Sequence, residues 1–303
     1  MGRIDKKKGK GKKWLKISLI SLLVIVIGIG VYVFSVYNSA RQTINTKAYE
    51  QVETIDREVV KKKMEKKEAL NILLLGVDQR ENDSGRSDAL MVLSLDPSSD
   101  SAQLISIPRD TRTEIIGRGT MDKINHAYAF GGPDMAINTV ENMLDIELDY
   151  FVRMNMEGLA DMVDVVGGIT VDNELAFGEF AIGEVNLDGK GALAYVRMRK
   201  QDPRGDFGRT ERQRKVIQGI IDKGANISSV GKIDNMIDVL GNNMATNMQF
   251  SDMQNLLFNY KDTRKNFTSY QLQGTGTKIN GIYYMTVTEE EISKVHSMIV
   301  KES

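Results

Sequence analysis

Two carboxylates flank a polar loop that separates two apolar runs of this chain. Asp78 follows the run NILLLGV (71–77), and Asp88 precedes the run ALMVLSL (89–95). A connection of this length joins antiparallel neighbours, so both carboxylates are expected at one end of a hairpin. Converging carboxylates repel each other and favour a cation between them, and Mg²⁺ is usually held by one or two carboxylates with water and phosphate oxygens. The pattern predicts a metal site at Asp78 and Asp88.

Arginines accompany these carboxylates. Arg80 and Arg86 lie in the loop, and Arg109 and Asp110 follow a third apolar run, QLISIP (103–108), which should return to the same edge. Because a planar guanidinium binds two phosphate oxygens at once, these carboxylates and arginines together predict a metal-assisted diphosphate site. The alternative is that the acids are ordinary turn residues and the arginines are solvated loop charges.

A second basic stretch, residues 195–217, holds six arginines against three acidic residues, which indicates an anion site. Arg197 and Arg199 alternate, so they would share a face if this segment is extended. Thr210 is the predicted N-cap of a helix, with Arg209 just ahead of it.

One face of that predicted helix carries Gln213, then Val216 or Ile217, then Ile220. A face that begins polar and becomes apolar suits a polar head group at the helix N-terminus with an apolar floor below it. Arg212 and Arg214 fall off this face and are expected on the surface. The alternative is an exposed, salt-bridged helix start.

The N-terminus has the pattern of a membrane anchor. Residues 17–37 carry no charge and, as a helix, would span about 30 Å, the thickness of a bilayer core. Residues 1–16 hold eight Lys or Arg and one Asp, so this tail is expected in the cytoplasm and the rest of the chain outside the cell membrane. The long apolar run without a cleavage site argues against a removed signal peptide, and its position makes an anionic membrane a better partner than nucleic acid. Residues 38–69 are polar and are expected to form a stalk.

The remainder, residues 70–303, is predicted to be one α/β domain with a central mixed sheet flanked by helices. Short apolar runs near its start predict strands. Helical patterns follow around residues 135–145, 156–166, 211–224 and 251–260. The chain has no cysteine and only two histidines, which excludes thiol nucleophiles and Cys-zinc sites and leaves little room for a Ser-His triad. His126 is interpreted as a structural histidine.

The motifs LLLGVD, GRSDALM, SIPRDT, KINHAYAFGG, VDVVGGITVD, ALAYVRMR and GDFGRTERQ occur in this order over roughly residues 70–220. In this respect the chain resembles the LytR-CpsA-Psr family of Gram-positive cell-envelope proteins, and it is most similar to the members that attach wall teichoic acid. The resemblance implies transfer of an anionic glycopolymer from an undecaprenyl-diphosphate carrier to the C6 hydroxyl of N-acetylmuramic acid in peptidoglycan. It also implies Mg²⁺ on the diphosphate and a long apolar pocket for the polyprenyl tail.

The same resemblance implies roles for individual residues. Asp78 and Asp88 would hold the metal, and Asp206 would orient an arginine or the acceptor hydroxyl beside the catalytic Arg109 and Asp88. The diphosphate would be bound by Arg86, Arg109, Arg197, Arg199, Arg209 and Gln213, with Arg80 in a loop of variable length. A polyprenyl-diphosphate hydrolase and a non-catalytic lipid-carrier-binding regulator remain as alternative functions.

Overall fold

The computed structural model describes residues 32, 34–77, 85–224 and 239–300 of the chain. The predicted cytoplasmic tail and most of the predicted anchor lie outside these residues, as do Asp78 and Arg80. Among the described residues, no helix is long and apolar enough to cross a bilayer.

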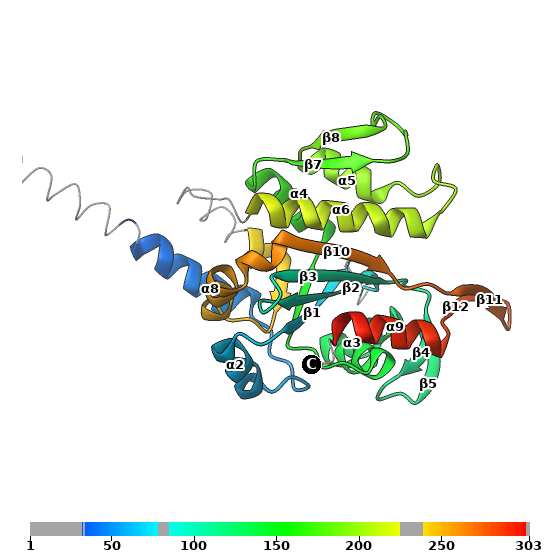
Figure 1. Cartoon of the computed structure of the whole chain (residues 1–303), viewed down its shortest axis with the longest axis horizontal. Coiled ribbons are helices and arrows are strands. Elements are labelled where there is room, and N and C mark those ends of the chain that lie inside the picture. Colours follow the sequence, from blue (N-terminus) through cyan, green and yellow to red (C-terminus); the bar gives the residue numbers. More distant parts are fainter. Residues whose placement is uncertain (1–31, 33, 78–84, 225–238, 301–303) are drawn as a thin grey trace, which may run out of the picture.

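A six-stranded mixed sheet organises the molecule, in the order β10-β3-β2-β1-β6-β9 (Figure 1). Its strands are β1 (Leu70–Val77), β2 (Ser87–Asp96), β3 (Ser101–Ile107), β6 (Tyr150–Met154), β9 (Met244–Thr246) and β10 (Asn266–Gln271). The three apolar runs form β1, β2 and β3, which pair antiparallel in chain order as predicted. β6 runs parallel to β1, and β10 runs parallel to β3. One edge of the sheet therefore carries the ends of β1, β3, β6 and β10 and the start of β2.

Helices cover both faces of the sheet, which explains why the central strands are apolar on both sides. Figure 1 shows α6 on one side of the strands and α3 and α9 on the other. The helices are α2 (Arg57–Lys66), α3 (His126–Leu144), α4 (Met156–Val165), α5 (Gly189–Arg197), α6 (Asp206–Gly224), α8 (Phe250–Asn259) and α9 (Glu289–Ile299), with short helical turns η1 (Ile44–Ala48) and η2 (Lys261–Lys265). The α/β prediction with a central mixed sheet is confirmed.

A second layer lies outside α6 and is built by α4, α5 and the hairpin of β7 (Ile169–Asn173) and β8 (Gly183–Leu187) (Figure 1). Its apolar cluster includes Val163, Tyr195 and Val216, all buried. Two further hairpins, β4 (Arg112–Ile115) with β5 (Thr120–Lys123) and β11 (Thr275–Ile279) with β12 (Ile282–Thr286), extend from the molecule. The sequence pattern does not predict β4, β5, β8, β9 or β11, because these strands are short and lack a run of apolar residues.

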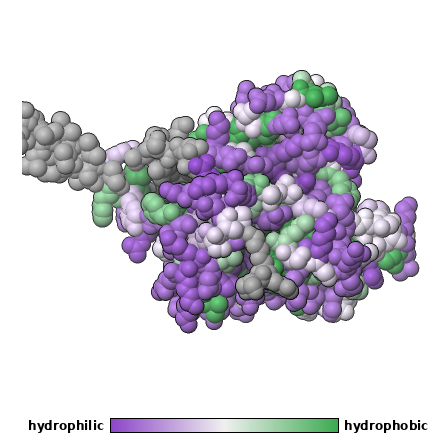
Figure 2. All heavy atoms as spheres, in the orientation of Figure 1, coloured by the Kyte–Doolittle hydropathy of each residue, from purple (hydrophilic) through white to green (hydrophobic). Residues whose placement is uncertain are grey.

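The segment expected as a stalk packs against the domain over most of its length, beginning with Ile44 and Ala48, which are buried against Met244 of β9. Val60 and Met64 of α2 are buried in the same apolar cluster as the sheet. Asp56 caps this helix by accepting a hydrogen bond from the backbone N–H of Glu58, at 2.9 Å. The face of the molecule drawn in Figure 2 is mainly hydrophilic.

Candidate diphosphate site and lipid cavity

The return of β3 to the edge of the β1–β2 hairpin places Arg109 beside Asp88. Asp88 is the second residue of β2, and Arg109 lies two residues beyond the end of β3. Nη1 of Arg109 donates to Oδ1 of Asp88. The neighbouring Asp110 instead pairs with Lys123 of β5, 2.6 Å away. The sheet topology thus brings together two of the residues that the sequence placed on this edge.

Asp206, the first residue of α6, joins this pair to two further arginines. Its Oδ2 lies 3.4 Å from Nε of Arg109, and its Oδ1 lies 2.9 Å from Nη2 of Arg209 and 3.5 Å from Nε of Arg199. One carboxylate therefore contacts three guanidinium groups. Because like charges repel, it holds them together at one point.

The site is partly buried, and its polar atoms are incompletely paired. Nε of Arg209 and Oε1 of Gln213 are buried without a hydrogen-bond partner among the described residues, and the contacts of Arg109 Nε and Arg209 Nη2 with Asp206 lack hydrogen-bond geometry. Such groups cost about 1–3 kcal/mol each, so folded proteins rarely keep several in one place without a use for them. Donors arranged in this way can bind an anionic substrate.

The charges of the arginines respond differently to their surroundings. Burial lowers the pKa of Arg109, but the hydrogen bond to Asp88 and the charge of Asp206 together outweigh this effect. The pKa of Arg109 is therefore raised above its usual value. Burial dominates at Arg209 and lowers its pKa, although Asp206 opposes the change. Guanidinium groups stay charged under all ordinary conditions, so the cluster is a permanent anion site.

The helix that carries Asp206 begins earlier than predicted. α6 begins at Asp206, so Thr210 is not its N-cap and Arg209 lies inside its first turn. The Thr210 hydroxyl donates to the carbonyl of Asp206, at 2.9 Å, within the helix. The glycine-rich GDFG sequence concealed this start, because glycine is a poor residue inside helices.

The prediction that Arg212 lies on the surface is wrong. Its side chain is buried and pairs with the buried Asp202, with Nη1 and Oδ2 2.7 Å apart. Its Nη2 donates to the carbonyl of Met198, also at 2.7 Å. This ion pair fixes the loop between α5 and α6, which carries Arg199, and its acidic member, Asp202, was not singled out from the sequence. The signal was the DPRG turn (202–205) followed by a basic residue nearly two helical turns into α6.

Arg214 is also buried, contrary to the prediction. Its Nη1 donates to Oγ of Ser106 at 3.0 Å and to Oε1 of Gln271 at 3.1 Å. No carboxylate among the described residues lies within ion-pair distance of it, and burial lowers its pKa. The helical periodicity missed this contact because α6 packs between two layers and buries more than one face.

Three predicted residues lie apart from the cluster or at its margin. Arg197 ends α5 and its nearest carboxylate is Glu157, 3.8 Å away, so it shares no partner with Arg199. Arg86 is exposed immediately before β2, and Gln213 is buried one turn beyond Arg209. The two loop residues Asp78 and Arg80 lie outside the described part of the chain.

An apolar cavity of about 530 Å³ begins next to the cluster and lies between α6 and the sheet. Gly76, Ala89 and Gln213 line its end near the arginines, and Ile217 and Ile220 continue its wall along α6. The predicted apolar floor is therefore present. Val216, offered as an alternative to Ile217, faces the second layer instead.

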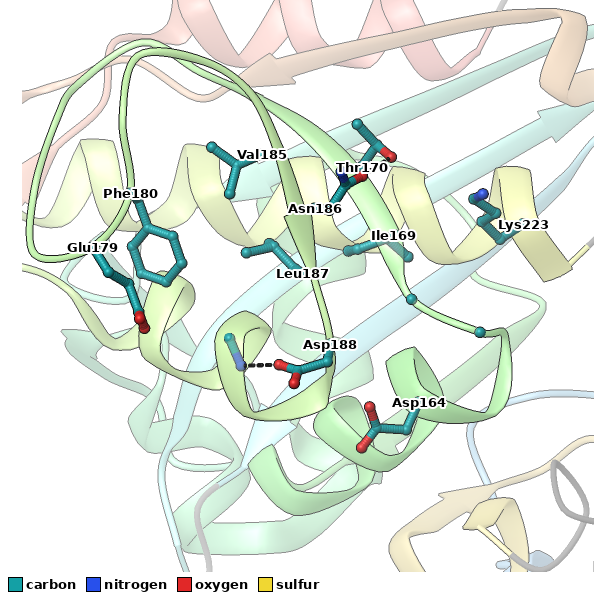
Figure 3. Close-up of a pocket in the computed structure, with 13 residues that line it drawn as sticks. Asp164, Ile169, Thr170, Glu179, Phe180, Val185, Asn186, Leu187, Asp188 and Lys223 are labelled. Carbon is teal, nitrogen blue, oxygen red and sulfur yellow. Dashed lines mark hydrogen bonds between the residues drawn. The ribbon is translucent and has the colours of Figure 1, made fainter.

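A separate polar pocket lies under the β7–β8 hairpin (Figure 3). Asp188 in this pocket caps α5 by accepting from the backbone N–H of Gly191, at 2.7 Å. Asp164 accepts from the backbone N–H of Gly189, at 2.6 Å. These two carboxylates thus bind the local backbone, and none of the predicted site residues lines the pocket.

Comparison with known proteins identifies the group to which this architecture belongs. A sequence profile of the LytR_cpsA_psr family matches residues 31–301. The chain belongs to the LytR_cpsA_psr family. It is 47% identical over 291 residues to the Bacillus subtilis polyisoprenyl-teichoic acid–peptidoglycan teichoic acid transferase TagU, covering 94% of this chain and 95% of that protein.

Solved structures of LytR_cpsA_psr relatives have the same fold. The crystal structure of B. subtilis TagU superposes with a TM-score of 0.64 at 49% identity, covering 77% of this chain and 96% of that one. TagT bound to LIIa-WTA superposes with a TM-score of 0.67 at 33% identity, covering 77% and 90% of the two chains. The recognition made from sequence motifs is thus confirmed at the level of the family.

The described residues of this LytR_cpsA_psr site are compatible with a metal that is shared with substrate. Arg109 pairs only with Oδ1 of Asp88, and the side chain of Asp88 is 36% exposed. No group of three His, Cys, Asp or Glu among the described residues could enclose an ion. Mg²⁺ needs no such enclosure, because it keeps water and phosphate oxygens as ligands beside one or two carboxylates.

Proposed function

We propose that this protein transfers wall teichoic acid from an undecaprenyl-diphosphate carrier to the C6 hydroxyl of N-acetylmuramic acid in peptidoglycan. The observation that carries the proposal is the cluster of Arg109, Asp206 and Arg209 at the mouth of an apolar cavity. A lipid diphosphate combines two anionic groups with a long apolar tail, and these two adjoining environments match its two parts. The name of the B. subtilis relative supports teichoic acid as the polymer and peptidoglycan as its acceptor.

In this proposal the hydroxyl oxygen of the acceptor attacks the phosphorus that bears the polymer. The bond from that phosphorus to the lipid-side bridging oxygen breaks, the lipid leaves as its monophosphate, and the hydroxyl proton is released. Arg109, Arg199 and Arg209 neutralise phosphate charge, and Asp206 orients these arginines. Phosphoryl transfer depends mainly on positioning and charge stabilisation, so no covalent protein nucleophile is needed.

The remaining predicted residues would complete the site. Asp88, with Asp78, would hold Mg²⁺, which when bound neutralises charge on the diphosphate. Gln213 would contact the diphosphate at the cavity mouth, where its Oε1 is buried without a partner among the described residues. Arg80, Arg86 and Arg197 would bind outer phosphate or sugar oxygens.

The same proposal assigns the parts of the chain to compartments. Residues 1–16 would lie in the cytoplasm, and residues 17–37 would cross the membrane once. Residues 38–69 would connect this span to the catalytic domain, residues 70–303, outside the cell. The chain would thus be a single-pass type II membrane protein. A donor that carries its own activated diphosphate bond suits this location, because no ATP is required.

The decisive experiment incubates the full chain in detergent with lipid-linked teichoic acid, with and without peptidoglycan oligomers. Polymer attached to glycan is the expected result. Polymer released into water without acceptor would indicate a hydrolase, and an intact bound donor would indicate a carrier-binding regulator. Either of these two results would contradict transfer.

The site assignment is tested in the same assay with Arg109→Ala. Loss of one charge-stabilising donor typically costs on the order of 10²–10³ in rate, so transfer should nearly vanish. Arg118→Ala is the matched control, because Arg118 is exposed and lies over the ring of Phe130, 3.9 Å from its centroid. Equal transfer by both variants would remove Arg109 from the mechanism.

The metal is tested separately by chelation. Transfer by the full chain should stop in EDTA, because EDTA removes the cation that Asp78 and Asp88 would hold. Transfer should return when Mg²⁺ is added. Mg²⁺ binding by Asp88→Asn, measured by calorimetry in the presence of lipid diphosphate, should be weaker than in the parent. Undiminished transfer in chelator would contradict the metal assignment.

A further inference from the structure

Exposed apolar side chains gather where the N-terminal helix, residues 34–43 of the described chain, meets α8. Phe34 and Tyr37 are 69% and 44% exposed, and Leu257 and Phe258 of α8 are 54% and 68% exposed. The ring of Tyr37 packs edge-on against Phe250 at the start of α8, with centroids 5.3 Å apart, so the two helices lie side by side (Figure 1). These four exposed residues, Phe34, Tyr37, Leu257 and Phe258, are called the α8 patch. Several exposed apolar side chains on two neighbouring helices indicate a contact with something other than water.

The α8 patch adjoins the far end of the apolar cavity. Leu257 lines that end together with Lys261 and Arg264, whereas Gln213 lines the end at the arginine cluster. From Gln213 to Gly224, α6 forms the wall of the cavity over eleven residues, which corresponds to about 16 Å. The cavity therefore reaches from the diphosphate site to the patch.

Basic residues accompany the patch. Arg41 on the N-terminal helix and Lys261 at the start of η2 are exposed, and Arg264 lies one turn beyond Lys261. Aromatic side chains together with Lys and Arg are typical of protein surfaces that rest at a membrane interface. Each basic residue near an anionic leaflet adds about 1 kcal/mol of attraction.

We propose that the α8 patch rests on the surface of an anionic phospholipid bilayer, and that the lipid tail enters the cavity from the bilayer at this end. The docking itself stands on the patch and its basic neighbours, while the entry of the tail rests on the proposed function. A membrane fits better than a soluble protein, because Phe34 and Tyr37 belong to the last turn of the uncharged segment 17–37, so α8 lies beside the point where the expected anchor leaves the bilayer. The arrangement leaves the diphosphate end of the cavity facing away from the bilayer.

Because the chain has no cysteine, single cysteines can report the docking in the full-length protein. Phe258→Cys carries an environment-sensitive fluorophore, and the protein is reconstituted into phosphatidylcholine–phosphatidylglycerol vesicles that contain nitroxide-labelled lipid. Ile182→Cys is the matched control, since Ile182 is 71% exposed and immediately precedes β8 in the second layer. Quenching at residue 258 should exceed that at 182 by roughly threefold, since the quencher acts only near the lipid surface. Equal quenching at both positions would overturn the proposal.

A functional arm tests the entry of the tail. Phe258→Ser should raise the KM for donor embedded in vesicles by roughly tenfold, the effect of losing one buried apolar side chain, and raise it much less for donor in detergent micelles. Ile182→Ser should change neither value. A KM for vesicle donor equal to that of the parent would overturn entry at this end. If no variant and no parent transfers polymer, the proposed function fails, and the fluorescence arm still decides the docking.

Discussion

At the scale of single residues, Asp206 is the group that makes an arginine cluster possible. Three guanidinium groups at one point repel one another, and only one carboxylate touches all three. Asp88 contributes a second negative charge through Arg109. The arginines are thus held in place before substrate arrives, which saves the reorganisation that mobile side chains would need during the reaction.

Replacing Asp206 by Asn should lower the rate of transfer by roughly 10²-fold, because the arginines lose the charge that orients them. The pH–rate profile should keep its shape, since an orienting carboxylate does not exchange protons with the acceptor. Asp172→Asn is the matched control, as Asp172 is exposed on β7. Loss of one limb of the profile in Asp206→Asn would show instead that Asp206 acts on the acceptor hydroxyl.

At the scale of elements, the loop before α6 depends on the close approach of Asp202 in the loop to Gly208 in the first turn of the helix. A Cβ on Gly208 would lie 1.7 Å from Oδ2 of Asp202, which pairs with the buried Arg212. Hydrogen bonds from Arg212 and Arg204 hold the pKa of Asp202 below its usual value, although burial alone would raise it. The absence of a side chain at Gly208 therefore allows the ion pair that anchors the loop carrying Arg199.

Gly208→Ala should lower the free energy of unfolding by about 1–3 kcal/mol, because the methyl group displaces Asp202 from Arg212. Gly224→Ala in the same helix is the control, since its added Cβ would meet nothing within 4 Å. It should be neutral or slightly stabilising. Urea unfolding followed by circular dichroism measures both, and equal midpoints would contradict the role of Gly208.

At the scale of the whole molecule, a buried ion pair fastens the N-terminal segment to the sheet. Lys63 of α2 lies 2.9 Å from Oδ1 of Asp149, whose side chain is almost completely buried just before β6. Burial raises the pKa of Asp149, although hydrogen bonds from Asn71 and Lys63 oppose the change. The segment that connects the α8 patch to the domain is thus tied to the strands that carry the site.

Lys63→Met should destabilise the protein by about 3–5 kcal/mol near neutral pH, because it leaves the Asp149 carboxylate buried and unpaired. Without Lys63, the pKa of Asp149 in the folded state should rise further above its unfolded value. The lost stability is then recovered as the pH falls through this range, so the deficit should be smaller at about pH 5 than at about pH 8. Lys61→Met, at an exposed position, is the control in urea unfolding. A deficit that does not change with pH would contradict the assignment.

Local patterns were sufficient to predict the central strands and the residues on their shared edge. Short apolar runs separated by turn residues allow only antiparallel hairpins, so β1, β2 and β3 followed, and with them the meeting of Asp88 and Arg109. The order of motifs predicted the family, which the profile match confirms. The α/β class and most helices followed from periodicity.

The contacts of α6 could not be predicted in the same way, because they depend on layers that come from distant parts of the chain. Arg212 and Arg214 lie on faces that a two-layer protein would expose, but α6 here lies between the sheet and the β7–β8 layer, so both are buried. Most of the expected stalk packs on the core for a similar reason, since its few apolar residues find partners only in the folded domain. The sequence by itself determined that Asp88 and Arg109 meet at the sheet edge, because strand pairing is local. Only the tertiary structure decided that Asp206 binds three arginines and that an apolar cavity joins them to α8, because both require helices separated by many residues to pack on the same face.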